Sequence, residues 1–140
     1  MNYTIFLILS ILLCSLSAQD EDWQLVGEER SVAISGITIV GGHTIVVHDN
    51  KREYEKRIGI IIESGPDLKY RLIEWPDKTL PFDLEALAAV PGNATDVIAM
   101  ESQGKCHWLV FEHAKMRFAY NGFIQIPNSK WPTNLEGFGL

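Results

Sequence analysis

The sequence contains little cysteine, no excess of basic residues and no apolar run long enough to cross a bilayer. Only two of its 140 residues are cysteines, and we expect Cys14 to be removed with an N-terminal leader, which leaves Cys106 alone. A single cysteine excludes an internal disulfide, so the fold must rest on a hydrophobic core. The formal net charge of −6 argues against nucleic acid or an anionic membrane as a partner.

The first 18 residues have the pattern of a secretory signal peptide. Residues 5–13 are apolar apart from one serine, and this run is shorter than the roughly 20 residues that a membrane-spanning helix needs. Small residues then lead into an acidic segment, so we expect cleavage after Ser17 or Ala18. The mature chain is therefore predicted to be secreted or periplasmic and to lack a transmembrane span, with residues 19–30 as a lead-in to the folded part.

Several motifs of common enzyme classes are absent from the sequence. It has no nucleophile elbow, no P-loop and no dinucleotide-binding fingerprint. His43, His107 and His113 do not have the spacing of metal ligands relative to one another. Cys106 precedes an apolar run, which favours an inert strand position over a reactive thiol.

The chain contains an internal repeat with a period of about 50 residues. The segment DLEAL at residues 83–87 returns as NLEGF at residues 134–138, and more weakly as ISGI at residues 34–37. Residues 46–50 align with 98–102, and residues 58–63 with 107–112, at offsets of 52 and 49 (98 − 46 = 52 and 107 − 58 = 49). A repeat of this length indicates propeller blades or solenoid units.

Each repeat is predicted to contain four β-strands. Runs of β-branched residues are separated by turn residues such as Gly41-Gly42, and length and composition fit one globular domain. Within residues 68–72, apolar residues alternate with Lys69 and Arg71, as in a strand with one solvated face. Asn121-Gly122 predicts a bulge or a tight hairpin in the last strand. The expected strands are residues 31–40, 43–48, 58–63 and 68–75, then 84–90, 95–101, 106–112 and 115–126.

These units predict an all-β fold made of β-propeller blades, each of four antiparallel strands. First strands are apolar and rich in small residues, whereas fourth strands are half polar, as expected for blades that radiate from a central channel. The blades are residues 31–80 and 83–127, and a further blade starts at residues 134–140. Two blades and one strand do not close a ring, so we expect open sheets and a fragment of a longer protein.

Acidic residues recur at matching places in the units. In a propeller, Glu85 and Glu136 would lie at equivalent positions on first strands, while Asp49 and Glu101 would end second strands. The four carboxylates are thus predicted to gather near one axis as ligands of a metal, with Ca²⁺ suited to such oxygen ligands. Glu85 and Glu136 are also candidates for a catalytic general base. Alternatively, they bond backbone amides and hold the blades together.

The tags at residues 83–87 and 134–138, the Pro91-Gly92 turn and the segment IAMES at residues 98–102 carry a family resemblance. With them the chain resembles the esterase-like phytase propellers, also called the phytase-like domain, over about residues 34–140. The resemblance implies a secreted or periplasmic propeller that acts as a phosphoesterase on phytate-like substrates.

The leading hypothesis is therefore a secreted phytase-like propeller that binds a small molecule or phosphoester, with metal-assisted hydrolysis at its hub. Whether the chain is an enzyme is left open. A second hypothesis is a non-catalytic propeller that binds an envelope or extracellular partner. A third is a lactonase-like or strictosidine-synthase-like propeller, which would use a similar Ca²⁺ site for different chemistry.

Overall fold

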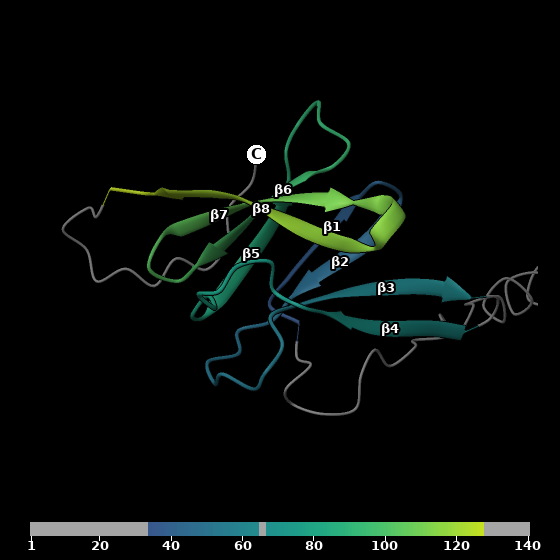
Figure 1. The fold of residues 1–140 in the computed structure, drawn as a ribbon, viewed down its shortest axis with the longest axis horizontal. Helices are drawn as coiled ribbons and strands as arrows, with labels where there is room; N and C mark the ends of the chain where they lie inside the picture. The colour runs from purple at the N-terminus through teal and green to yellow at the C-terminus, as the bar shows by residue number, and fades with distance from the viewer. Residues whose placement is uncertain (1–33, 65–66, 128–140) are drawn as a thin grey trace, which may run out of the picture.

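The computed structural model describes residues 34–64 and 67–127, and this part of the chain forms two four-stranded sheets (Figure 1). One short 3-10 turn, η2 (His113–Lys115), precedes the last strand. The first sheet consists of β1 (Gly36–Val40), β2 (His43–Val47), β3 (Ile58–Ser64) and β4 (Asp67–Ile73). The second consists of β5 (Leu84–Ala89), β6 (Asp96–Glu101), β7 (Lys105–Glu112) and β8 (Arg117–Gln125).

Both sheets are antiparallel meanders, in which each strand pairs with the next one along the chain. Two all-β sheets of four strands are what the sequence predicts for residues 31–80 and 83–127, and this part of the prediction is confirmed. The described residues form no closed ring, as expected. Residues 1–18, 19–30 and 134–140 lie outside the described part.

The local sequence explains how the first hairpin forms. Gly41 and Gly42 both have positive φ angles, 55° and 77°, as required for the two-residue turn that matches the twist of paired strands. The flanking strands, ITIV and TIVV, consist almost entirely of β-branched residues, which favour extended backbone. Val40 and His43 form the last pair of the ladder beside this turn.

The hydrophobic core lies between the two sheets. Alternate residues on each strand point to one face, and one face of each sheet contributes to a common buried cluster. Phe111 and Phe118 are its aromatic centre, with ring centroids 5.1 Å apart. The first sheet contributes Ile45, Val47, Ile58, Ile60 and Ile73, and the second contributes Leu84, Leu87, Val97, Ala99, Leu109, Phe111 and Phe118.

The first strands of the two sheets run side by side and parallel. Two hydrogen bonds join them: the Ser35 hydroxyl donates to the Leu84 carbonyl at 2.6 Å, and the Ala89 amide donates to the Thr38 hydroxyl at 3.1 Å. The later residue of one strand thus contacts the later residue of the other, as in parallel strands. Between these contacts, a Cβ on Gly36 would lie 2.7 Å from the backbone nitrogen of residue 87. Only glycine permits this close approach of two backbones.

First strands were predicted to be apolar and rich in small residues, but of the two described first strands only β5 has both faces in buried clusters. The second face of β5 joins a smaller cluster that contains Ala86, Ile98, Met100 and Cys106. By contrast, Ile37 and Ile39 of β1 are 58% and 68% exposed. The outer face of the first sheet therefore presents apolar side chains to solvent.

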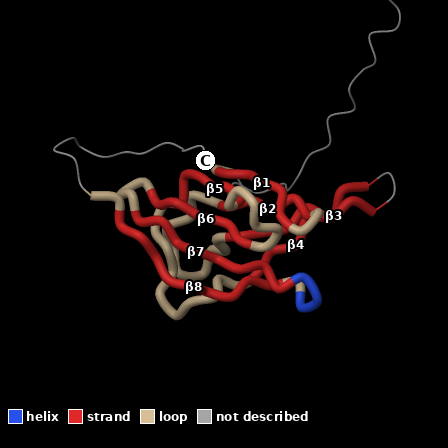
Figure 2. The backbone as a smooth tube through the Cα atoms, turned by 90° about the horizontal axis from the view of Figure 1, so that it is seen from above, coloured by secondary structure: helices blue, strands red, loops and turns tan. Residues whose placement is uncertain are grey.

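The predicted irregularity at Asn121-Gly122 is a β-bulge. His107 pairs with Phe123 and Leu109 with Tyr120, so Asn121 and Gly122 together lie opposite one residue of β7. Gly122 has a φ of 107°, which an L side chain rarely adopts. Strand β8 continues through the bulge and does not fold back as a hairpin; Figure 2 shows it following the blue η2 turn as a single strand.

No helix among the described residues has the length and apolar character to cross a membrane.

Candidate functional site

Asp83 is held where β5 begins. It has a φ of 62°, in the left-handed region that aspartate tolerates better than most residues. Its Oδ1 lies 2.8 Å from the ammonium of Lys51, and its Oδ2 accepts a 3.1 Å hydrogen bond from the Ser102 hydroxyl. Asp83 thereby connects the loop after β2 with the turn after β6.

Glu85 is the extra residue of a bulge at the start of β5. Leu84 pairs with Glu101 and Ala86 with Met100, so Glu85 has no opposite residue on β6. A bulge of this kind changes the direction of a side chain and ends regular pairing. The start of β5 is therefore shaped to place this carboxylate.

Two neighbouring carboxylates repel the carboxylate of Glu85. Burial raises the pKa of Glu85 above its usual value, and the negative charges of Asp83 and Asp49 raise it further. The positive charge of Lys51 lowers the pKa of Glu85. The pKa of Lys51 is itself raised, chiefly by its hydrogen bond to Asp83. The acids and Lys51 form one electrostatic unit, which we call the β5 acidic cluster: Asp49, Asp83, Glu85 and Lys51.

The β5 acidic cluster contains two of the four predicted metal ligands. Asp49 lies close enough to raise the pKa of Glu85, as does Asp83, which the sequence did not single out. Glu101 instead lies against a histidine, and Glu136 is outside the described residues. In residues 34–64 and 67–127, no three acidic, histidine or cysteine side chains are placed to hold one metal ion.

Glu101 begins a buried chain of polar side chains. Its Oε1 lies 2.6 Å from Nε2 of His107, and Nδ1 of His107 lies 3.2 Å from the Tyr120 hydroxyl. An ionised carboxylate can only accept, so Nε2 carries a hydrogen, and Nδ1 of a neutral ring then accepts from the tyrosine. Burial raises the pKa of Tyr120, with further contributions from Asp77 and Glu101. Tyr120 therefore stays protonated and acts as a donor.

Trp75 covers this chain from the connection between the sheets. Its ring meets the His107 ring edge-on, with centroids 5.1 Å apart. Its indole Nε1 is buried and, among the described residues, has no hydrogen-bond partner. Such a donor is costly to bury without a partner, so the ring is held in place by packing.

The first sheet has a shorter version of the same arrangement. Nε2 of His48 forms a hydrogen bond with the Tyr70 hydroxyl. The tyrosine passes over Gly59, where an added Cβ would lie 2.5 Å from the tyrosine oxygen. Burial raises the pKa of Tyr70 to about 12. In both sheets a tyrosine of the last strand is thus tied to a polar residue at the end of the second.

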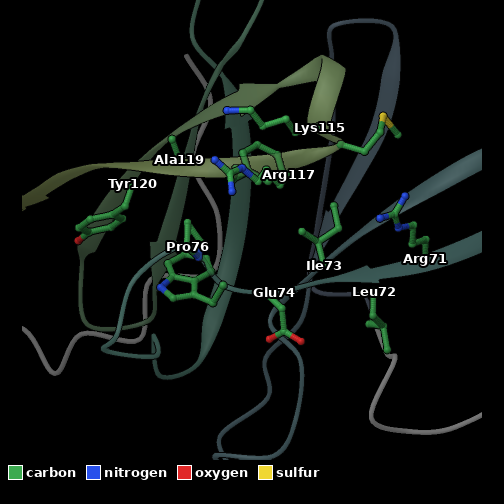
Figure 3. Close-up of a pocket in the computed structure, with 12 residues that line it drawn as sticks. Arg71, Leu72, Ile73, Glu74, Pro76, Lys115, Arg117, Ala119 and Tyr120 are labelled. Carbon is green, nitrogen blue, oxygen red and sulfur yellow. The ribbon is translucent and has the colours of Figure 1, made fainter.

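A groove of about 660 Å³ lies between the outer strands β4 and β8. Figure 3 shows Arg71 at one end and Tyr120 at the other, with Arg117 between them. Arg117 Nε donates to the Glu112 carboxylate at 2.5 Å, and Lys115 lies 3.3 Å from the same group. These two cations also lower the pKa of Glu112. Arg71, Lys115 and Arg117 make the groove basic in an otherwise acidic protein.

Sequence reasoning did not identify the basic groove, because Arg71 and Arg117 are 46 positions apart (117 − 71 = 46). A signal was nevertheless present. The fourth strand of each predicted blade carries a lysine and an arginine two positions apart, at Lys69 and Arg71 and at Lys115 and Arg117. In the structure Lys115 belongs to η2 and Arg117 is the first residue of β8, and both line the same groove as Arg71 of β4.

Cys106 is buried, and its burial raises the pKa of the thiol, which agrees with the predicted inert position on a strand.

No protein-family model, curated protein or solved structure matches the chain. The fold and side-chain geometry therefore carry the functional reasoning.

Proposed function

We propose that the two sheets are neighbouring blades of a secreted β-propeller similar to the phytase-like family, with a Ca²⁺ site at the β5 acidic cluster. Three features support the blade arrangement. Each sheet is a four-stranded meander, the sheets pack face to face, and their first strands run parallel in close contact at Gly36. Propeller blades combine these features around a central channel.

The observation that carries the cation proposal is the grouping of Asp49, Asp83 and Glu85 around Lys51, whose ammonium lies 2.8 Å from Asp83. Carboxylate oxygens are the ligands that Ca²⁺ prefers, and an uncompensated group of acids favours binding of a cation. In the described conformation the three acids are not placed to hold one ion, and the ammonium of Lys51 supplies the compensating charge. Because its side chain is 51% exposed, it is free to swing into solvent when a divalent ion takes its place.

Phosphoester hydrolysis is the activity that the family resemblance suggests for this site. A bound Ca²⁺ would supply a Lewis acid for a phosphoryl oxygen. The chain's own contribution would be Glu85, whose raised pKa makes it a better proton acceptor than an ordinary exposed glutamate. Glu136 remains a proposed further ligand, whereas Glu101 is engaged by His107 and is assigned to support of the second sheet.

Calorimetric titration with Ca²⁺ and melting curves of the full chain test the cation site. A ligand at 100 times its dissociation constant stabilises by about 2.7 kcal/mol, so Ca²⁺ is expected to raise the melting temperature by several degrees. Glu85→Gln removes a repelled charge. It should raise the melting temperature without Ca²⁺ and reduce the shift that Ca²⁺ produces. Lys51→Gln should tighten Ca²⁺ binding, because it removes the competing cation.

Glu63→Gln is the matched control, since Glu63 is an exposed glutamate on β3, away from the cluster. It should leave Ca²⁺ binding unchanged. Identical melting curves of the unmodified chain in Ca²⁺ and in chelator would refute the site. Release of inorganic phosphate from a phosphate monoester, measured separately, tests the activity.

Non-catalytic binding of an extracellular or envelope component is a second candidate function. The exposed Ile37 and Ile39 on β1 favour it, because contiguous apolar surface often marks an interaction site. This function predicts Ca²⁺ binding without turnover of a phosphate monoester. Phosphate release that depends on Glu85 would decide against it.

A further inference from the structure

The outer edge of β4 is unpaired among the described strands. The order of the first sheet is β1-β2-β3-β4, so one side of β4 bonds to β3 and the other side faces outward. An edge strand presents a row of free backbone N–H and C=O groups, and an extended segment of another chain can pair with them.

The side chains of β4 alternate between two chemistries. Lys69 and Arg71 lie opposite Ile62 and Ile60 of β3, so they lie on the face that packs against the second sheet. Both are exposed, and neither side chain makes a hydrogen bond or ion pair with another described residue. The opposite face carries Leu68 and Leu72, 38% and 41% exposed, and Tyr70 between them.

The groove next to β4 strengthens the basic side. Arg71 lines one wall, and Lys115 and Arg117 line the other (Figure 3). Glu74 is the one acidic residue of the lining, and it is paired with Lys56. Glu112 lies outside the lining and pairs with Lys115 and Arg117. Arg71 is thus the lining cation without an acidic partner among the described residues. In a chain with a net charge of −6, this groove is where an acidic segment is attracted and not repelled.

We propose that the β4 edge and its groove bind an extended peptide segment in which acidic and apolar residues alternate, as a fifth strand of the first sheet. Its acidic side chains would meet Lys69 and, at the groove, Arg71, and its apolar side chains would meet Leu68 and Leu72. Opposite-charge pairs between neighbouring strands stabilise their pairing, and the backbone bonds add affinity that does not depend on sequence.

The same charges that protect this edge also select the partner. Lysine and arginine on an edge strand prevent it from pairing with the identical edge of another copy, because like charges would then meet. An acidic strand removes that repulsion. The site shares no residue with the β5 acidic cluster, so it stands or falls independently of the Ca²⁺ proposal.

Fluorescence anisotropy with the full chain and a labelled seven-residue peptide of alternating valine and glutamate tests the proposal. We expect binding that weakens with added salt. Lys69→Glu combined with Arg71→Glu should weaken it at least tenfold and create binding to a peptide of alternating valine and lysine. Lys78→Glu, an exposed lysine on the β4–β5 connection, is the matched control and should bind nearly as the unmodified chain does.

Two altered peptides separate strand addition from simple charge attraction. One has the same composition with all glutamates in one block, and the other carries N-methyl groups on alternate amides, which removes half of the backbone donors. Both should bind at least tenfold more weakly. Equal binding of either altered peptide, absence of binding by the alternating peptide, or no effect of the double charge reversal would overturn the proposal.

Discussion

In the first sheet the Tyr70 hydroxyl crosses Gly59 and meets His48; in the second, the Tyr120 hydroxyl meets His107, which in turn meets Glu101. Both arrangements tie the fourth strand of a sheet to the end of its second strand. One does so directly over a glycine, and the other through an inserted imidazole. The two sheets thus keep the same places for polar contacts but fill them with different residues.

The pairing of the strands shows that these places correspond. Gly36 lies beside residues 86 and 87, so the pair Gly36–Val47 matches the pair Ala86–Met100. When the strand pairs are followed outward from this point, His48 corresponds to Glu101 and Gly59 to His107. On the fourth strands, Tyr70 corresponds to Tyr120. The tyrosine is thus constant between the sheets, and the two positions beneath it have changed.

The matched positions lie on different sides of the interface. His48 alternates with the core residues Ile45 and Val47, so it lies on the face of the first sheet that points away from the second. His107 pairs with Ala99 of the core and lies on the face that points toward the first sheet. In blades arranged around a shared axis, one face of each blade points toward the preceding blade and the other toward the next. Matching residues of the two sheets lie on the face toward the preceding position, which supports the proposed blades.

The largest effect is expected from breaking the contact that sets the two sheets side by side. Gly36→Val would drive a branched side chain into the backbone of β5, where even a Cβ would be 2.7 Å from a nitrogen atom. We expect a loss of about 4 kcal/mol in the free energy of unfolding, measured by urea denaturation.

Gly42→Val is the control for Gly36→Val, because nothing lies within 4 Å of a Cβ there although its φ is 77°. It should cost less, through backbone strain alone. Equal losses in the two variants would show that close packing of β1 on β5 does not determine stability.

The next largest effect is expected from removing the imidazole that distinguishes the second sheet. His107→Ala leaves the Glu101 carboxylate buried without its partner and opens space beneath Trp75. We expect a loss of about 3 kcal/mol. Adding Glu101→Gln to this variant should recover part of the loss, because it removes the unpaired charge. A double-mutant cycle by urea denaturation measures the coupling, and strictly additive losses would contradict it.

Much of the fold could be predicted because strand formation leaves a local signal. β-branched runs, a two-residue alternation and turn dipeptides such as Gly41-Gly42 all act within a few residues of one another. The number of strands, their order and the bulge at Asn121-Gly122 follow from these features. Asp49 and Glu85 were also expected to lie near each other, and in the structure the charge of Asp49 raises the pKa of Glu85.

The register of the repeat could not be read from sequence similarity. The apolar segments of the two units align at offsets of 52 and 49 residues. The strand pairing instead gives an offset of 53 between His48 and Glu101 (101 − 48 = 53) and of 48 between Gly59 and His107 (107 − 59 = 48). A shift of one residue moves every side chain of a strand to the opposite face. The contact of Glu101 with His107 was missed for this reason, although the β6–β7 hairpin makes them diagonal neighbours.

The smallest effect concerns the shared tyrosine, and it tests the comparison through pH. Tyr70 has a pKa of about 12 in the folded protein and a reference value of 10.0, so above pH 10 the unfolded chain loses this proton first. The unfolded state then binds fewer protons than the folded state, so the free energy of unfolding falls as pH rises from 10 to 12. Tyr70→Phe removes the hydrogen bond to His48 and should lower the free energy of unfolding by about 1 kcal/mol at neutral pH. The fall of that free energy above pH 10 should become shallower.

Tyr54→Phe is the control for Tyr70→Phe, since Tyr54 is an exposed tyrosine of the β2–β3 loop. The measurement is the free energy of unfolding in urea at several values between pH 7 and pH 11.5. If Tyr70→Phe and Tyr54→Phe change the alkaline decline equally, the hydroxyl of Tyr70 is not held by the first sheet. In that case the direct bond over Gly59 would not be the counterpart of the His107 bridge, and the matching of the two sheets would rest on their backbones alone.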